Sequence, residues 1–419
     1  MRILILGADG FIGRHIAVHF RSQGDHVIAS ARRVSRLSRM GFDTLRCDLA
    51  SPEASTPAFW RDNLRDVDAV VYAAGLLTGS EARFQAVHVT ALQALLQTRP
   101  PTCPALFLSA VGIDEVDTPF ARYRRDSERV CQQEGAITLR AGLVLGDTSY
   151  GGSSLARALS ALPLITPQIG GGQQAFNPIH AADLSNSIDD LLSRNQPGHY
   201  EIGGPETVTQ KDMLTAYRRW LGLGGSLALP LPRWLARGIG WVGDRMQLGP
   251  ISSTAVDQLD AGVLATVTIP DDSPPPRSFT QFLHARPAGT QDLWHARLYL
   301  LRPLLRVTLA FLWLFSAALG LFLAPETFLP MLPNAPWPDG ISVLMARLGG
   351  VVDLALGLAL LRGWRPKLIA AAQFAMVATY TLAFTLLAPV LWLLPLGGVL
   401  KNLPILMLIA ISAVLEDER

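Results

Sequence analysis

The stretch MRILILGADGFIGRHIAVHF, residues 1–20, decides the fold of the N-terminal part of the chain. Ile3–Leu6 is a short apolar run typical of a buried strand, and a helix is expected to begin near Phe11. The glycines between them are Gly7, Gly10 and Gly13. In a turn that meets a pyrophosphate, such glycines allow the tight turn, the approach of the backbone to the phosphate, and close helix–strand packing. The positive end of the helix then favours the anion, so the stretch predicts a nucleotide-binding turn.

The residues after the second predicted strand, His26–Ser30, indicate which dinucleotide is preferred. A protein that prefers NAD carries an acidic residue about 20 residues past the glycines, where it accepts from the ribose hydroxyls. Arg32 and Arg33 stand there instead, and guanidinium groups pair well with a 2′-phosphate. We therefore expect NADP(H) in preference to NAD(H). A solvated basic loop is the alternative, because two further arginines, Arg36 and Arg39, continue the run.

Further short apolar runs alternate with helical segments along the first part of the chain. The predicted strands are Leu45–Leu49, Asp68–Ala73, Leu106–Ser109 and Ile137–Leu145. This alternation predicts an α/β fold with a doubly wound parallel sheet of the Rossmann type. We expect the sheet domain in residues 1–205, and a small substrate-side or linker subdomain in residues 206–290.

Six motifs in this order resemble the short-chain dehydrogenase/reductase superfamily, in its extended or atypical branch. They are GADGFIG (7–13), CDL (47–49), YAAG (72–75), SAVG (109–112), LRAGLVLG (139–146) and FNPIHAADL (176–184). The resemblance covers about residues 1–205. It implies that Asp48 contacts the adenine, that Ala74 and Gly75 line the cofactor, and that Ser109 lies beside the nicotinamide. With the glycine turn, the predicted cofactor-binding residues are Gly7, Gly10, Phe11, Ile12, Gly13, Arg32, Arg33, Asp48, Leu49, Ala73, Ala74 and Gly75.

The proton-transfer pair of that superfamily is missing from its expected place. Members use a Tyr as proton donor and a Lys four residues later, since hydride transfer to a carbonyl leaves an alkoxide that needs a proton. Here Phe120 and Arg124 occupy these positions, and a register that uses Tyr123 puts Ser127 at the Lys position. The candidate catalytic residues are therefore Ser109, Tyr123 and Arg124. The pattern resembles atypical members such as the NADPH-binding accessory subunit of respiratory complex I, in which the dinucleotide can be largely structural.

Composition excludes some other functions. The formal net charge is +2, from 36 basic and 34 acidic residues, so no basic footprint for nucleic acid is present. The three cysteines have no metal-ligand spacing, and no metal site is expected. His88 and His180 are expected to be structural histidines.

The last part of the chain predicts a membrane domain at residues 291–419. A span needs about 20 apolar residues, and four are predicted: about 307–324, 341–361, 368–388, and 390 or 399 to 415. Leu368–Leu400 is uncharged over 33 residues, and Pro389 divides it. The fold class is thus a Rossmann domain followed by an all-α bundle of four transmembrane helices. This part resembles the DoxX-like membrane family, which is often fused behind atypical dehydrogenase domains.

Basic residues cluster before the first span and between the second and third. By the rule that such residues stay inside, both the N-terminal domain and the C-terminus are expected in the cytoplasm. We expect a multi-pass protein of a bacterial-type inner membrane. Arg347, Asp353 and Lys401 fall inside predicted spans, where charge is costly, so Asp353 is expected to pair with Lys401 or Arg347.

Two functions fit this sequence. The first is an NADP(H)-dependent oxidoreductase or isomerase acting on an apolar substrate from the bilayer, such as a quinone, isoprenoid or lipid. The second is a non-catalytic NADPH-binding module that senses redox state or stabilises a membrane complex. The lipid bilayer is the expected partner in both, and membrane-protein partners are expected in the second.

Overall fold

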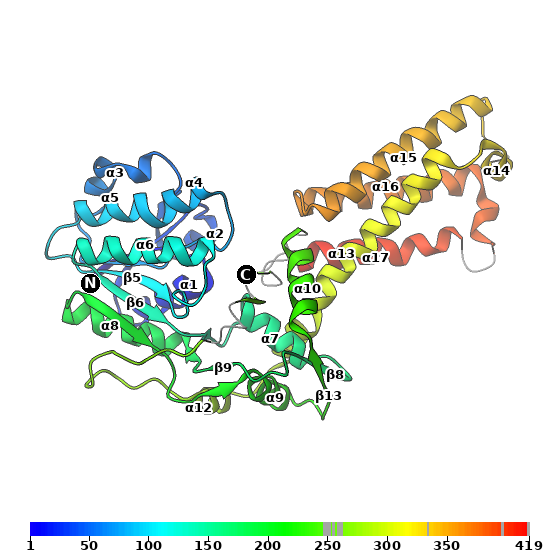
Figure 1. Ribbon diagram of the computed structural model, residues 1–419. Coiled ribbons are helices and arrows are strands. Elements are labelled where there is room, and N and C mark those ends of the chain that lie inside the picture. The colour runs from blue at the N-terminus through cyan, green and yellow to red at the C-terminus, as the bar shows by residue number, and fades with distance from the viewer. Residues whose placement is uncertain (246–252, 254–255, 258–262, 333–334, 395–397, 417–419) are drawn as a thin grey trace. The chain divides into compact units, whose positions relative to one another are not determined.

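The computed structural model describes residues 1–245, 253, 256–257, 263–332, 335–394 and 398–416 (Figure 1). The chain divides into two compact units, which we call the N-terminal and the C-terminal unit. The N-terminal unit comprises Met1–Trp241 and Pro250–Ala296, and the C-terminal unit comprises Val242–Gly249 and Arg297–Arg419. Most of segment 206–290 therefore packs in the same unit as residues 1–205.

The N-terminal unit is built on a seven-stranded parallel sheet in the order β11-β6-β5-β4-β1-β2-β3. Its strands are β1 (Arg2–Leu6), β2 (His26–Ala31), β3 (Asp43–Arg46), β4 (Ala69–Tyr72), β5 (Ala105–Ala110), β6 (Ile137–Ala141) and β11 (Gly198–Ile202). Ile3 lies opposite Val27 on β2 and Ala69 on β4, so β1 is central. The strand order reverses around β1, and ligands of such sheets bind at the carboxyl ends beside that reversal. The predicted doubly wound sheet is confirmed.

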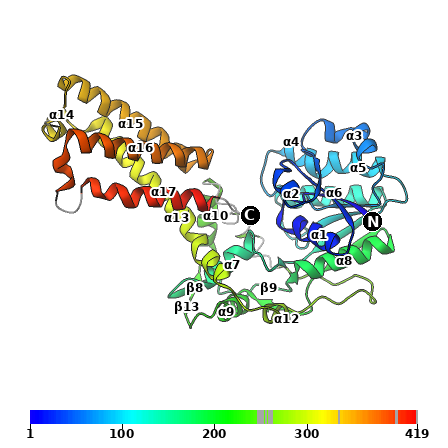
Figure 2. The same ribbon diagram turned by 180° about the vertical axis from the view of Figure 1, so that it is seen from behind.

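Helices cover both faces of this sheet (Figures 1 and 2). One face carries α1 (Phe11–Ser22) and α8 (Ala181–Arg194), and the other carries α3 (Pro57–Asn63), α5 (Ala91–Thr98) and α6 (Pro119–Gln133). Along β1, Ile3 and Ile5 belong to the core on the first face, and Leu4 and Leu6 to the core on the second. Burial on both faces explains why β1 is a continuous apolar run. The shorter elements are α2 (Ser35–Arg39), the 3₁₀ turn Glu53–Ser55, α4 (Glu81–Phe84) and the π-helical turn Gln85–Thr90.

A second layer of small elements follows the main sheet. The strands pair as β7 (Val144–Leu145) with β10 (Ile179–His180), β9 (Ala175–Phe176) with β12 (Val208–Thr209), and β8 (Ile165–Ile169) with β13 (Leu227–Leu231). The helices are α7 (Gly152–Ser160), α9 (Gln210–Trp220), α10 (Arg233–Arg245) and α12 (Phe279–His284). The single strand predicted for Ile137–Leu145 is wrong: β6 ends at Ala141, and β7 then pairs with β10 outside the main sheet.

Among the described residues, three helices are long and apolar enough to cross a membrane: α13 (Thr290–Phe322), α15 (Asp339–Leu361) and α16 (Pro366–Leu387). They match the first three predicted spans to within two residues at their C-terminal ends, although α13 begins well before residue 307, with Pro303 inside it. Large apolar side chains point away from the bundle, including Phe311 (68% exposed) and Phe322 (82% exposed). Apolar exposure on this scale suits lipid better than water. The connection after α13 forms α14 (Pro325–Phe328) and the 3₁₀ turn Leu329–Met331.

The fourth predicted span differs from the structure if it starts at residue 390. The chain makes 3₁₀ turns at Pro389–Trp392 and Val399–Lys401 before α17 (Asn402–Leu415) begins. Pro389 has no N–H to donate, which stops α16 from continuing. α17 has 14 residues, about 21 Å at 1.5 Å per residue, and is shorter than a hydrocarbon core of about 30 Å.

The ion pair expected for Asp353 is also wrong. Asp353 is 3% exposed, and its carboxylate accepts from the hydroxyls of Ser316 and Tyr380. The Arg347 guanidinium instead donates to the carbonyls of Gly320 and Leu323. These carbonyls have no partner within α13, because the helix ends there.

Candidate nucleotide-binding site

The glycine turn between β1 and α1 has no room for side chains at two positions. Gly7 has φ +82°, and a Cβ there would lie 2.8 Å from the Cα of Ala74. A Cβ on Gly13 would lie 2.3 Å from the Gly7 carbonyl oxygen, so α1 packs directly onto the turn. Gly10 precedes α1 with no side-chain cap, which leaves the first N–H groups of the helix available to an anion.

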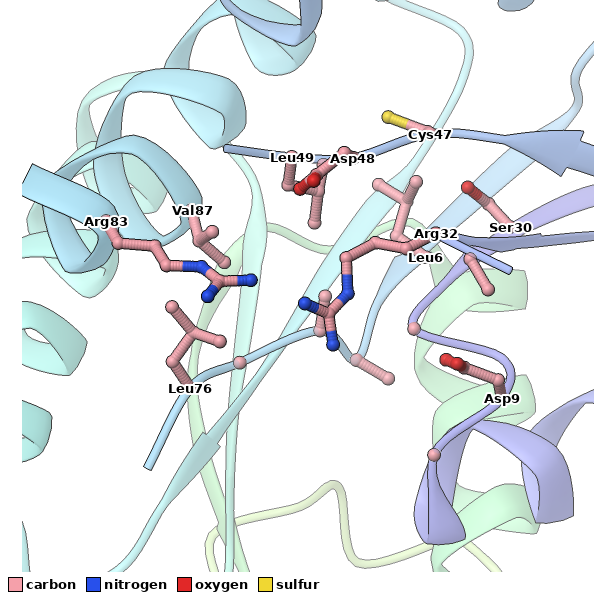
Figure 3. A pocket seen from close by; sticks show the side chains of 16 residues that line it. Leu6, Asp9, Ser30, Arg32, Cys47, Asp48, Leu49, Leu76, Arg83 and Val87 are labelled. Atoms are coloured by element: carbon pink, nitrogen blue, oxygen red, sulfur yellow. The ribbon is translucent and has the colours of Figure 1, made fainter. Parts of the chain in front are cut away.

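A pocket of about 160 Å³ opens beside this turn, at the carboxyl ends of β1, β2 and β4 (Figure 3). It is lined by Leu6, Gly7, Asp9, Gly10, Ser30, Ala31, Arg32, Cys47, Asp48, Leu49, Ala73, Ala74, Gly75, Leu76, Arg83 and Val87. This is the position at which the strand order reverses, where open parallel sheets bind nucleotides.

Eight of the twelve predicted cofactor residues line this pocket: Gly7, Gly10, Arg32, Asp48, Leu49, Ala73, Ala74 and Gly75. The other four lie beside it. Phe11 stacks on Tyr150 with ring centroids 6.4 Å apart, and Ile12 packs into the core under the turn. Gly13 supports the turn from α1, and Arg33 is exposed outside the lining.

Two charged residues that sequence reasoning missed, Arg83 and Asp9, also line the pocket. In Figure 3 the guanidinium of Arg83, from α4, extends toward that of Arg32 at the end of β2. Among the described residues, neither guanidinium has a hydrogen bond or an ion pair. Two unpaired cations at one pocket favour an anionic ligand. Asp9 is in the glycine turn itself, and only its position inside the quoted motif could have identified it.

Ser109 is held by a buried ion-pair network. Its hydroxyl donates to Glu128 Oε1 at 2.5 Å, and Glu128 is paired with Arg140 by two bonds, Nε–Oε1 at 2.8 Å and Nη2–Oε2 at 2.7 Å. Arg140 also contacts Asp114 and Glu201. The Ser109 hydroxyl proton is thus directed at Glu128. The residue is 4% exposed and does not line the pocket.

Arg124 points into the protein from α6 rather than into the pocket. Its guanidinium donates to the Leu108 carbonyl and lies over the rings of Phe107 and Phe120, at 5.1 and 5.3 Å from the centroids. Burial lowers the pKa of Arg124 to about 10, far above neutral pH, so the group stays charged. The guanidinium packs against the backbone of Gly75, because a Cβ added to Gly75 would be only 2.3 Å from Arg124 Nη2.

Phe120 and Tyr123 both pack in an apolar cluster that adjoins the pocket. Phe120 is 7% exposed and joins Phe84, Ile113 and Ala121. The Tyr123 ring stacks on Phe84, with centroids 5.4 Å apart and planes 13° apart. None of Ser109, Tyr123 and Arg124 lines the pocket.

His88 lies in the same cluster, on the π-helical turn Gln85–Thr90. Its Nε2 accepts from the Leu76 N–H at 3.0 Å, which fixes the proton on Nδ1. Burial, with a smaller contribution from the charge of Arg124, lowers the pKa of His88 to about 3. His88 is therefore a neutral histidine that holds the segment after β4, which lines the pocket, at Leu76.

His180 begins α8 and accepts the Ala182 N–H at 3.2 Å. Arg277 contacts both His180 and, at 3.0 Å, the Asp183 carboxylate. These contacts join the start of α8 to the segment before α12.

Family models match both parts of the chain. Residues 3–98 match the NAD dependent epimerase/dehydratase family, and residues 310–410 match the DoxX-like family. The chain joins an epimerase/dehydratase-like Rossmann domain to a DoxX-like domain. The first match contains the glycine turn and the whole pocket lining. The second contains the last 13 residues of α13, all of α15 and α16, and the first part of α17.

Solved structures similar to the epimerase/dehydratase-like domain include dTDP-glucose 4,6-dehydratase from Bacillus anthracis in complex with NAD, with 17% identity and a TM-score of 0.47 over 55% of this chain and 84% of that chain. UDP-N-acetylglucosamine 4-epimerase from Bacillus cereus has 15% identity and a TM-score of 0.45, covering 55% and 85%. ADP-L-glycero-D-manno-heptose-6-epimerase from Helicobacter pylori has 14% identity and a TM-score of 0.47, covering 55% and 84%. No match was found among curated proteins.

Proposed function

We propose that this chain is a membrane-anchored NADP(H)-binding protein that holds the dinucleotide as a ligand and does not turn it over through a Tyr–Lys pair. The observation that carries the proposal is the inward position of Arg124 beside a buried Phe120. A phenyl ring has no proton to give, and a guanidinium is not a useful acid near neutral pH. Of the other two candidates, Ser109 has its hydroxyl proton directed at Glu128, and Tyr123 is stacked on Phe84 outside the pocket lining.

The preference for NADP(H) rests on the charges of the pocket. Arg32 and Arg83 face it without an acidic partner among the described residues, and a 2′-phosphate would supply the missing anion. The pyrophosphate would meet the first N–H groups of α1, which follow Gly10, because the N–H groups of Gly7 and Gly10 already donate to the carbonyls of Ser30 and Gly7. Asp48 is the residue proposed to contact the adenosine.

A bound but unreacted dinucleotide would act as a redox sensor, or as a stabiliser of a membrane complex. Its occupancy would follow the cellular NADPH pool, and the DoxX-like helices would carry that signal to membrane-protein partners. The proposed location is a bacterial-type inner membrane. The epimerase/dehydratase-like domain would be in the cytoplasm with the C-terminus, because the basic residues flank the spans on that side.

The fusion to apolar helices favours a second candidate, an oxidoreductase or isomerase that takes an apolar substrate from the bilayer, such as a quinone, isoprenoid or lipid. Its proton would then come from an improvised donor. Tyr123 and Ser109 are the residues proposed for that role.

The two functions are separated by following NADPH with the full chain in mild detergent. Saturable NADPH binding is expected, with no oxidation on adding membrane extract above the rate of Gly13→Ala, whose clash with Gly7 should prevent binding. NADPH oxidation that is lost in Tyr123→Phe or Ser109→Ala would overturn the proposal in favour of the second candidate. Phe120→Tyr combined with Arg124→Lys is the companion variant, because activity gained there would identify the absent acid as the only deficit.

A further inference from the structure

A lone carboxyl group lies deep inside the DoxX-like domain. Asp353 is eight residues before the end of α15, about 12 Å along the helix, and is 3% exposed. Its Oδ2 is 2.6 Å from the Ser316 hydroxyl on α13, and its Oδ1 is 3.0 Å from the Tyr380 hydroxyl on α16. A Cβ on Gly349 would be 3.0 Å from the Tyr380 oxygen, so this glycine gives the hydroxyl its place.

No cation compensates Asp353 among the residues that the structure describes. Arg347, on the same helix, is engaged with two carbonyls at the end of α13, and Lys401 is exposed. The other ionisable group that faces Asp353 is Tyr380, and α17 has none. An uncompensated carboxylate inside hydrocarbon is costly, and one bound proton removes that cost.

The hydrogen-bond geometry of Asp353 suits both protonation states. With Asp353 ionised, the hydroxyls of Ser316 and Tyr380 both donate to it. With a proton on Oδ2, Asp353 donates to Ser316 Oγ, whose own hydrogen turns to a carbonyl of its helix, and Tyr380 still donates to Oδ1. A proton is gained or lost here without breaking the contacts among the three helices.

We propose that Asp353 is a proton-binding site of the DoxX-like domain, which takes up and releases one proton between the hydroxyls of Ser316 and Tyr380. The carboxyl group lies in a core that is otherwise largely apolar, formed by residues such as Leu309, Leu356 and Val377. Polar groups are retained inside a membrane where they bind or relay an ion. This site is independent of the nucleotide and needs no redox step.

Infrared spectroscopy of the full chain in lipid nanodiscs tests the site. We expect a protonated-carboxyl carbonyl band in a pH titration that is absent from Asp353→Asn. Tyr380→Phe should move this band to higher frequency, because the carbonyl oxygen loses a donor. Thr379→Val is the matched control, since its exposed hydroxyl bonds only to the Ala375 carbonyl of its own helix. If Asp353→Asn fails to fold, the Tyr380→Phe shift decides alone. A wild-type spectrum without such a band at any pH, or a band unmoved in Tyr380→Phe, overturns the proposal.

Discussion

The pair Arg32 and Arg33 offers a sharp test of the nucleotide preference. Both stand at the end of β2 and both are exposed, yet only Arg32 lines the pocket. Arg32→Ser should therefore weaken NADP⁺ binding, and Arg33→Ser should have little effect. Because the two positions are adjacent, Arg33→Ser controls for the loss of one positive charge from this part of the surface.

The size of the effect follows from the environment of Arg32. A hydrogen bond to a charged group contributes about 1.5–3 kcal/mol, and solvent at this exposed position reduces it toward the lower value. A loss of about 1.5–2 kcal/mol corresponds to roughly a 10- to 30-fold higher Kd for NADP⁺. Arg83 remains opposite and retains part of the attraction. NAD⁺ has no 2′-phosphate, so its Kd should change by less than about twofold.

Isothermal titration calorimetry of the full chain in detergent measures both constants. Raising the salt concentration should reduce the difference between the Kd values for NADP⁺ and NAD⁺ in the wild type, because salt screens exposed charge pairs. An equal loss of NADP⁺ and NAD⁺ affinity in Arg32→Ser would refute the reasoning, as would an equal effect of Arg33→Ser.

Three further predictions concern the packing around the pocket. Gly7→Ala should abolish nucleotide binding and lower the melting temperature more than Gly24→Ala, which should cost about 1 kcal/mol of stability. Both glycines have positive φ, but only a Cβ on Gly7 would meet backbone atoms. Equal losses in the melting temperature of the two variants would contradict this. Glu128→Gln should destabilise the domain by about 1.5 kcal/mol in chemical denaturation, because Ser109 and Arg140 lose a charged partner while Arg140 keeps Asp114 and Glu201. A change below about 0.5 kcal/mol would count against the network. The pKa of His88 is about 3 in the folded protein, against an ordinary value of 6.5. Its contribution to the free energy of unfolding is therefore complete above pH 6.5 and is lost as the pH falls toward 3. His88→Gln should remove this acid-side loss from the melting-temperature profile, and parallel profiles of the variant and the wild type would argue against it.

Features of the chain that rest on neighbouring residues could be predicted from the sequence. The glycine turn at Gly7–Gly13, the strand β1 and the apolar helices each have a local pattern, and the structure follows these patterns closely. The predicted strand Leu45–Leu49 is less accurate, because β3 ends at Arg46 and shares only two residues with it. The end of α16 is one residue from the predicted limit because Pro389 is a local stop signal. The sequence also showed that Phe120 and Arg124 stand where the superfamily has its Tyr and Lys.

Contacts made across the fold could not be read in this way. Arg83 reaches the pocket from α4, and nothing in its sequence context marks it as a lining residue. The direction of Ser109 depends on Glu128 and Arg140, which come from a helix and a neighbouring strand. For Asp353 the sequence suggested a charged partner, because charges are easy to see in a sequence. The hydroxyls that it contacts stand on two other helices, and Ser and Tyr are not conspicuous in an apolar span.

The most direct test of the account is the identification of the nucleotide that stays with the full chain after gentle detergent purification. Mass spectrometry of the released nucleotide should find NADP⁺ or NADPH at close to one per chain, and the Gly13→Ala variant should release none. If the folded wild-type chain released no pyridine dinucleotide, and bound neither NADPH nor NADH when either was added, the central claim would be contradicted.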